Sequence, residues 1–200
     1  MEQRTQEWFE ARLGKVTASR ISDVLAKPTT AAYQNYQAQI ISERLTGERA
    51  EQFVNAAMEW GTEQEPNARR AYEFIADCEV AEEGFVDHPA IIGAGASPDG
   101  LVGDVGLIEI KCPNTATHLR FLQDGKIEPK YARQMYWQMA CTGREWCDFV
   151  SYDPRLPDKF GFRIVRQERC DKTINELEAA VEAFLSDIDG AINDLNRQYS

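Results

Sequence analysis

The stretch from residue 79 to residue 112 constrains the fold more than any other part of this 200-residue chain. It reads EVAEEGFVDHPAIIGAGASPDGLVGDVGLIEIKC, and its short apolar runs are interrupted by Gly, Pro and Asp. This pattern is typical of strands joined by tight turns. The last strand, GLIEIKC (106–112), is apolar on both sides of its first charged residue. We therefore expect a buried strand whose charges need a metal ion or a charged partner.

Helical patterns flank these strands. Before them, helices are expected at Trp8–Leu13, Thr17–Ala26, Tyr33–Leu45 and Ala56–Ile75, and Pro66 either kinks the last of these or lies near its start. After them, we expect helices at Thr115–Leu122 and Pro129–Cys141, strands at Trp146–Tyr152 and Phe160–Gln167, and an amphipathic helix from Asp171. This order predicts an α/β fold, an α/β/α sandwich around a mixed central sheet. Since residues 1–200 contain no repeat or linker-like stretch, we expect a single domain.

Charge and composition narrow the possible functions. The net charge of -11 argues against nucleic-acid binding, because Lys and Arg supply most of the affinity for phosphates. A DNA-binding role would need locally concentrated positive charge, metal ions or enclosure of the substrate. No apolar run is long enough to span a membrane, and the first residues are polar, which predicts a cytoplasmic protein. The five scattered cysteines lack a C-x-x-C pair, so we expect reduced thiols.

One constellation carries chemistry. Asp99 lies in a Pro-Asp-Gly turn from which it can bend back toward Glu109, and on an extended strand Glu109 and Lys111 point to the same face. Two carboxylates with the carbonyl of Ile110 between them suit Mg²⁺ or Mn²⁺. Lys111 would orient the attacking water, or help to deprotonate it if its pKa is depressed. The alternative, an ordinary turn followed by a solvated Glu-x-Lys face, is disfavoured by the apolar surroundings.

Six sequence blocks are spread over nearly the whole chain: LGKVTAS (13–19), Trp60-Gly61 with Glu65 and Ala68-Arg69, SPDGL (97–101), IEIKCP (108–113), ARQ (132–134) and YDPR (152–155). In these blocks and in their order the chain resembles the bacteriophage lambda exonuclease family, the YqaJ-like viral recombinases of the PD-(D/E)xK superfamily with its restriction-endonuclease-like core.

That resemblance implies an enzyme, a processive 5′-to-3′ exonuclease that acts on double-stranded DNA ends. It implies two Mg²⁺ ions in each site (Mn²⁺ as a substitute) and no ATP. The products would be 5′-mononucleotides and 3′ single-stranded tails for phage-type recombination by a single-strand annealing protein, the implied partner, in the cytoplasm of a bacterial host. Similar proteins form homotrimeric rings, and a ring that encloses DNA needs little affinity for it.

The resemblance also assigns roles to residues. Asp99, Glu109 and the Ile110 carbonyl become metal ligands, Lys111 the catalytic lysine and Glu65 an acidic residue near the second metal. For Glu65 the alternative is a capping box beginning at Thr62. The implied 5′-phosphate pocket comprises Arg12, Ser19, Ser97 and Gln134. Met58 occupies the position of an apolar wedge that opens the terminal base pair, with burial in the core as the alternative.

Two other functions remain open from the sequence. In the first, the chain is a different PD-(D/E)xK nuclease, such as an endonuclease or a junction resolvase. In the second, it is a non-catalytic subunit that binds DNA ends during recombination. Nuclease activity on linear and circular DNA separates these alternatives from the exonuclease.

Overall fold

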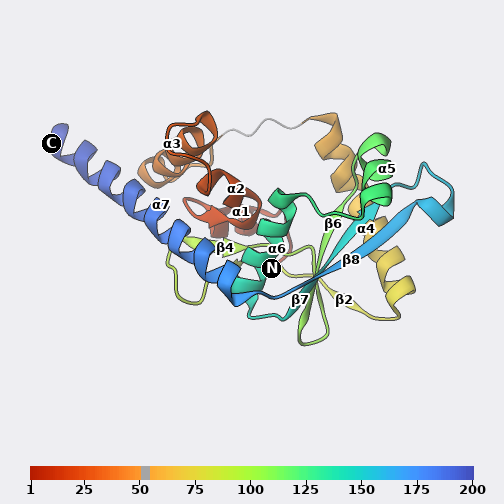
Figure 1. Cartoon of the computed structure of the whole chain (residues 1–200). Coiled ribbons are helices and arrows are strands. Elements are labelled where there is room, and N and C mark those ends of the chain that lie inside the picture. Colours follow the sequence, from red (N-terminus) through yellow and green to blue (C-terminus); the bar gives the residue numbers. More distant parts are fainter. Residues whose placement is uncertain (51–54) are drawn as a thin grey trace.

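A five-stranded mixed sheet forms the centre of the computed structural model, which describes residues 1–50 and 55–200 (Figure 1). Its strands are ordered β2 (Val80–Ala81), β5 (Gly100–Val102), β6 (Gly106–Lys111), β7 (Trp146–Tyr152) and β8 (Phe162–Glu168). β6 and β7 are parallel, and the other neighbours are antiparallel. β6, predicted to be buried, therefore has a neighbour on each side, and five of its six residues are buried.

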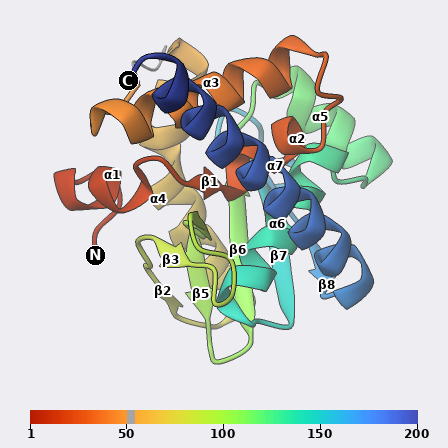
Figure 2. The same ribbon diagram turned by 90° about the vertical axis from the view of Figure 1, so that its left-hand side faces the viewer.

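Helices cover both faces of this sheet. Ile108 and Ile110 of β6 pack with Ala68 and Tyr72 of α4 (Ala56–Ala76). The opposite face packs against α6 (Pro129–Thr142) and α7 (Asp171–Gln198), in a core that includes Leu107, Phe149, Met135 and Val181. Figure 2 shows α6 and α7 in front of the strands and α4 behind them. The predicted α/β fold with a mixed sheet between helices is confirmed.

The N-terminal segment departs from its prediction at one place. The helix expected at Thr17–Ala26 is preceded by a strand, β1 (Val16–Thr17), and consists of a 3-10 turn η1 (Ala18–Arg20) and α2 (Ile21–Val24). β1 pairs in parallel with β4 (Ala94–Ala96), which also pairs with β3 (Val86–Asp87). The expected helix began too early because pairing with a distant strand overrides local helix propensity.

The other N-terminal helices form as predicted. α1 (Gln6–Arg12) and α3 (Ala31–Thr46) both begin at threonine caps, and α3 ends at Gly47 in the left-handed conformation. α3 packs against α7, and α2 packs against both α6 and α7 (Figure 2). The N-terminal segment therefore forms an outer layer over the helices that cover the sheet.

Helix α4 corrects two expectations. It begins at Asn55, whose side chain accepts hydrogen bonds from the backbone N–H groups of Ala57 and Met58, both at 3.0 Å. Pro66 lies well inside the helix, so the alternative that it marks the start is wrong. A capping box at Thr62 is also wrong, because Thr62 already lies within the helix and cannot cap it.

The C-terminal half follows the predicted boundaries closely. α5 (Thr115–Asp124), α6 and the short turn η2 (Asp158–Phe160) connect the strands, and α7 buries Ile174, Leu177, Val181, Phe184, Leu185 and Ile188. Its last turns extend beyond the core, where Leu195 is 38% exposed (Figure 1). All five cysteines are free thiols, as predicted. Within the described part of the chain, no helix combines the length and the apolar character needed to cross a membrane.

Candidate active site

Three charged side chains meet beside strands β5 and β6. Asp99 lies directly before β5, and its Oδ2 accepts a 2.7 Å hydrogen bond from the backbone N–H of Ile110. Glu109 and Lys111 both lie on β6 and form an ion pair through Oε1 and Nζ. Ile110, between them, packs on the opposite face of the sheet. The structure thus brings together the three residues predicted to be catalytic.

Burial and mutual repulsion determine the charges of this group. Burial raises the pKa of the Asp99 carboxyl well above its ordinary value, and the nearby Glu109 carboxylate raises it further. Burial acts to lower the pKa of Lys111, but Glu109 and Asp99 outweigh it, so this pKa lies above its usual range. Both roles predicted for Lys111, orienting the attacking water and helping to deprotonate it, stay predictions, because a bound metal ion would itself act to lower this pKa.

The carboxylate pair has the chemistry of a divalent-cation site. Glu109 is 0% exposed, and among the described residues the ammonium of Lys111 contacts its Oε1. A buried carboxylate is stabilised by a nearby cation, and a metal ion bound between Glu109 and Asp99 would share this role with Lys111. Within residues 1–50 and 55–200, no three His, Cys, Asp or Glu side chains are grouped to hold a metal. Two carboxylates and the Ile110 carbonyl would therefore need water or phosphate oxygens to complete the coordination.

Glu65 approaches the site from α4. Its Oε2 accepts a 2.6 Å hydrogen bond from Arg4, and its Oε1 accepts one of 3.0 Å from Arg69. Glu65 is close enough to raise the pKa of Asp99. Since arginines bind both of its oxygens, its role as a ligand of a second metal stays a prediction.

The position after Asp99 has no room for a side chain, so it must be the glycine Gly100. A Cβ at this position would lie 2.2 Å from Cγ1 of Val80 and 3.1 Å from two side-chain carbons of Ile108. The glycine of the Pro-Asp-Gly segment therefore allows β2 and β6 to approach on either side of β5. Close packing of these strands holds Asp99 beside Glu109.

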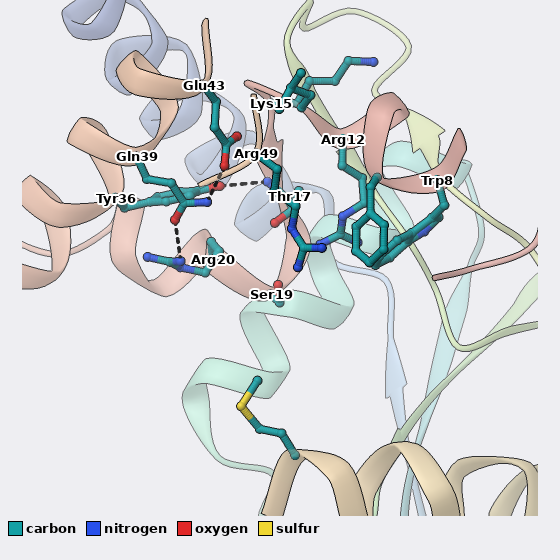
Figure 3. Close-up of a pocket in the computed structure, with 13 residues that line it drawn as sticks. Trp8, Arg12, Lys15, Thr17, Ser19, Arg20, Tyr36, Gln39, Glu43 and Arg49 are labelled. Carbon is teal, nitrogen blue, oxygen red and sulfur yellow. Dashed lines mark hydrogen bonds between the residues drawn. The ribbon is translucent and has the colours of Figure 1, made fainter. Parts of the chain in front are cut away.

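A basic pocket lies between α1, α3 and the start of α4 (Figure 3). Its volume is about 450 Å³. Four basic residues and one acidic residue line it among the residues that the structure describes: Arg12, Lys15, Arg20, Arg49 and Glu43. Basic side chains outnumber acidic ones in this lining on a chain whose net charge is -11, although Lys15 is paired with Asp87 and Arg20 with Asp23. This is the concentration of positive charge that a phosphate-binding role requires.

Arg12 is the cation of this pocket best suited to bind an anion. Its guanidinium lies 3.9 Å from the centre of the Trp8 ring and donates a 3.2 Å hydrogen bond to Ser97 Oγ. It forms no ion pair with a carboxylate of the described residues, whereas Arg20 is paired with Asp23. Burial lowers the pKa of Arg12 to about 10, so Arg12 remains charged at neutral pH. An incoming phosphate would supply the missing counter-charge.

The remaining residues predicted for the phosphate pocket lie in different positions. Ser19 is exposed and lines the pocket, and Ser97 accepts hydrogen bonds from Arg12 and Trp8. Gln134 is partly buried on α6, and its side chain makes no hydrogen bond to another described residue. Met58 lines the pocket and is 51% exposed, so its alternative assignment to the core is wrong.

Sequence reasoning missed three residues of this region. Trp8 donates a 2.9 Å hydrogen bond to Ser97 through Nε1, and Arg49 lies 3.9 Å over the Phe9 ring, near Arg12. Gln138 donates a 2.6 Å hydrogen bond to Glu109 Oε2. Only Gln138 could have been noticed in the sequence. It is a polar amide within the largely apolar run MYWQMAC (135–141).

The mixed sheet with a carboxylate pair and a lysine beside two adjacent strands defines a PD-(D/E)xK-like fold of the nuclease type. The chain belongs to the YqaJ-like viral recombinase domain family, whose model matches residues 7–145. This match includes the three charged residues beside β5 and β6 and all the residues that line the basic pocket. No curated protein matches the chain.

Solved structures agree with this assignment. The chain is 55% identical to an alkaline exonuclease, LHK-Exo from Laribacter hongkongensis, over 97% of each chain with a TM-score of 0.92. A structure of LHK-Exo in complex with dAMP matches with the same identity and a TM-score of 0.93. A phage-related exonuclease from Haemophilus somnus 129PT is 16% identical over 90% of this chain and 96% of its own, with a TM-score of 0.71, and shares the fold. The family and the first relative together support a nuclease role in recombination.

Proposed function

We propose that the chain is a processive, ATP-independent 5′-to-3′ exonuclease that acts on double-stranded DNA ends and requires Mg²⁺. One observation carries this proposal: the basic pocket and the carboxylate pair are joined by a single short segment. Ser97 accepts the hydrogen bond from Arg12, and two residues later Asp99 faces Glu109. A terminal phosphate held at Arg12 would therefore place the adjoining nucleotide near the carboxylates.

Different residues would bind the metal, orient the attacking water and hold the terminal phosphate. Asp99, Glu109 and the Ile110 carbonyl would hold the metal, and Lys111 would orient the attacking water. Bound Mg²⁺ lowers the pKa of water and neutralises charge that develops on the phosphate. Arg12, assisted by Ser19, Ser97 and Gln134, would hold the 5′-phosphate, because guanidinium groups bind phosphate through paired hydrogen bonds. Met58, half exposed at the rim of the pocket, would separate the terminal base pair.

The products follow from this arrangement. Hydrolysis on the 3′ side of the held nucleotide releases a 5′-mononucleotide and leaves the other strand as a 3′ single-stranded tail. The complex of LHK-Exo contains dAMP, a nucleotide of the same chemical class as this product. Such tails are substrates for a single-strand annealing protein, which we propose as the partner in recombination.

We further propose that three copies form a ring around the DNA. The chain is strongly acidic overall, with 33 acidic and 22 basic residues, so non-specific affinity for the DNA backbone is expected to be low. A closed ring stays on its substrate by enclosing it and needs little affinity. Sedimentation of the purified protein tests this directly, since a monomer would leave processivity without a basis.

Digestion of end-labelled linear duplex DNA with Mg²⁺ tests the enzymatic proposal. The wild type should release the 5′ label as a mononucleotide before the 3′ label, and leave a circular plasmid intact until it is linearised. Lys111→Ala should bind DNA ends but release neither label. Cutting of the circular plasmid would indicate an endonuclease instead. DNA-end binding without cleavage in Mg²⁺ or Mn²⁺ would indicate a non-catalytic subunit.

A further inference from the structure

Gln138 is an unusual residue for its position on α6. Its side chain is 0% exposed, and the helix around it is buried and apolar, with Met135, Trp137 and Met139 as near neighbours. A buried amide is costly unless its donor and acceptor groups are both hydrogen-bonded. The side chain of Gln138 therefore needs two partners within the core.

Both partners are present, and they fix the orientation of the amide. Gln138 Nε2 donates a 2.6 Å hydrogen bond to Glu109 Oε2, and Gln138 Oε1 accepts one of 3.9 Å from the thiol of Cys147. A carboxylate can only accept and a thiol is a donor, so the NH₂ group must face Glu109. The amide thus links neighbouring strands, since Glu109 lies on β6 and Cys147 on β7.

We propose that Gln138 is a positioning residue that holds Glu109 in the orientation required to bind the metal. The inference rests on the proposed metal site. With Oε2 engaged by Gln138, Glu109 meets Lys111 through Oε1 alone. Among the described residues, Gln138 and Lys111 are the side chains that contact these two oxygens. Without the amide, the carboxylate would be free to rotate and to present both oxygens to Lys111, which would then compete more strongly with the cation for Glu109.

Binding of Mn²⁺ in the absence of DNA, measured by calorimetry, tests the proposal. Gln138→Met preserves the approximate volume of the side chain but removes the donor, and the Mn²⁺ dissociation constant should rise about 10- to 100-fold, as for other residues that orient metal ligands. The Mg²⁺ concentration for half-maximal cleavage should rise by a similar factor, while kcat at saturating Mg²⁺ recovers. Wild-type affinity in a folded Gln138→Met protein would overturn the proposal.

Two further variants complete the test. If Gln138→Met fails to fold, as judged by its thermal transition, Gln138→Asn takes its place: its shorter amide cannot reach Glu109 and Cys147 together, and Mn²⁺ affinity should again fall. Glu109→Gln separates the two proposals, because it should abolish the binding that Gln138→Met only weakens. If the wild type and Glu109→Gln bind Mn²⁺ equally, the metal site itself is refuted. If Glu109→Gln fails to bind while both Gln138 variants bind normally, the role of Gln138 alone is refuted.

Discussion

Substitution of Arg12 by alanine should remove the preference for 5′-phosphorylated ends. Arg12 donates to Ser97 Oγ at 3.2 Å and stacks on Trp8, but no described carboxylate forms an ion pair with it. Arg12→Ala therefore leaves no buried carboxylate unpaired, and the loss should appear in binding of the terminal phosphate. The folded state itself should change little.

The size of the loss can be worked from these contacts. A hydrogen bond to a charged group contributes about 1.5–3 kcal/mol. Arg12 would make a paired contact with the phosphate, but Arg49 lies close enough to lower the pKa of Arg12 and would retain part of the attraction. A net loss of about 2–3 kcal/mol corresponds to a fall of roughly 30- to 150-fold in the preference, at about 1.4 kcal/mol for each factor of ten.

The assay compares kcat/KM for two linear duplexes that differ only in a 5′-phosphate or 5′-hydroxyl. Arg12→Lys should retain part of the preference, because an ammonium cannot form the paired contact. Arg20→Ala is the matched control, since Arg20 lines the same pocket but is bound by Asp23 and Gln39. Equal digestion of the two duplexes by the wild type, or an unchanged preference in Arg12→Ala, would refute the reasoning.

Three other substitutions test separate parts of the structure. Met58→Ala should slow digestion of fully paired ends more than frayed ends, with Phe74→Ala, an exposed position (88%) on the same helix, as the control; equal slowing of both ends would exclude a wedge. Glu65→Gln should reduce the number of Mn²⁺ ions bound in calorimetry from two to one, and an unchanged number would assign Glu65 to its ion pairs with Arg4 and Arg69. Asp153→Asn should lower the free energy of unfolding by about 2 kcal/mol at neutral pH, since hydrogen bonds from Arg155 and Thr115 outweigh burial and lower the pKa of Asp153. The pKa of Asp153 is depressed in the folded state, so its stabilising effect is fully present above the pKa of the unfolded chain, about 4. This effect disappears as the pH falls through the pKa of the folded state. Urea unfolding in acid should therefore show no difference between the wild type and Asp153→Asn.

Local sequence signals located most of the elements. β7 occupies the predicted residues 146–152, and α3 ends at Gly47 because that residue adopts the left-handed conformation that glycine tolerates. Hydrophobic periodicity also identified the buried stripe of α7. These features depend on neighbours within one or two turns, so they can be read from the sequence. The strand at Val16–Thr17 could not be, because its partner at Ala94–Gly95 is far away in the chain.

The sequence by itself determined the chemistry of the candidate site. The alternation of a strand places Glu109 and Lys111 on one face, and the apolar residues around them predict that this strand is buried. Tertiary structure decided which groups meet them. Ser97 meets Arg12 across 85 residues of chain, and Glu109 meets Gln138 across 29, because the sheet and its covering helices bring distant segments together. Such contacts depend on how the helices and strands pack together. This packing cannot be predicted from the residues that are neighbours in the sequence.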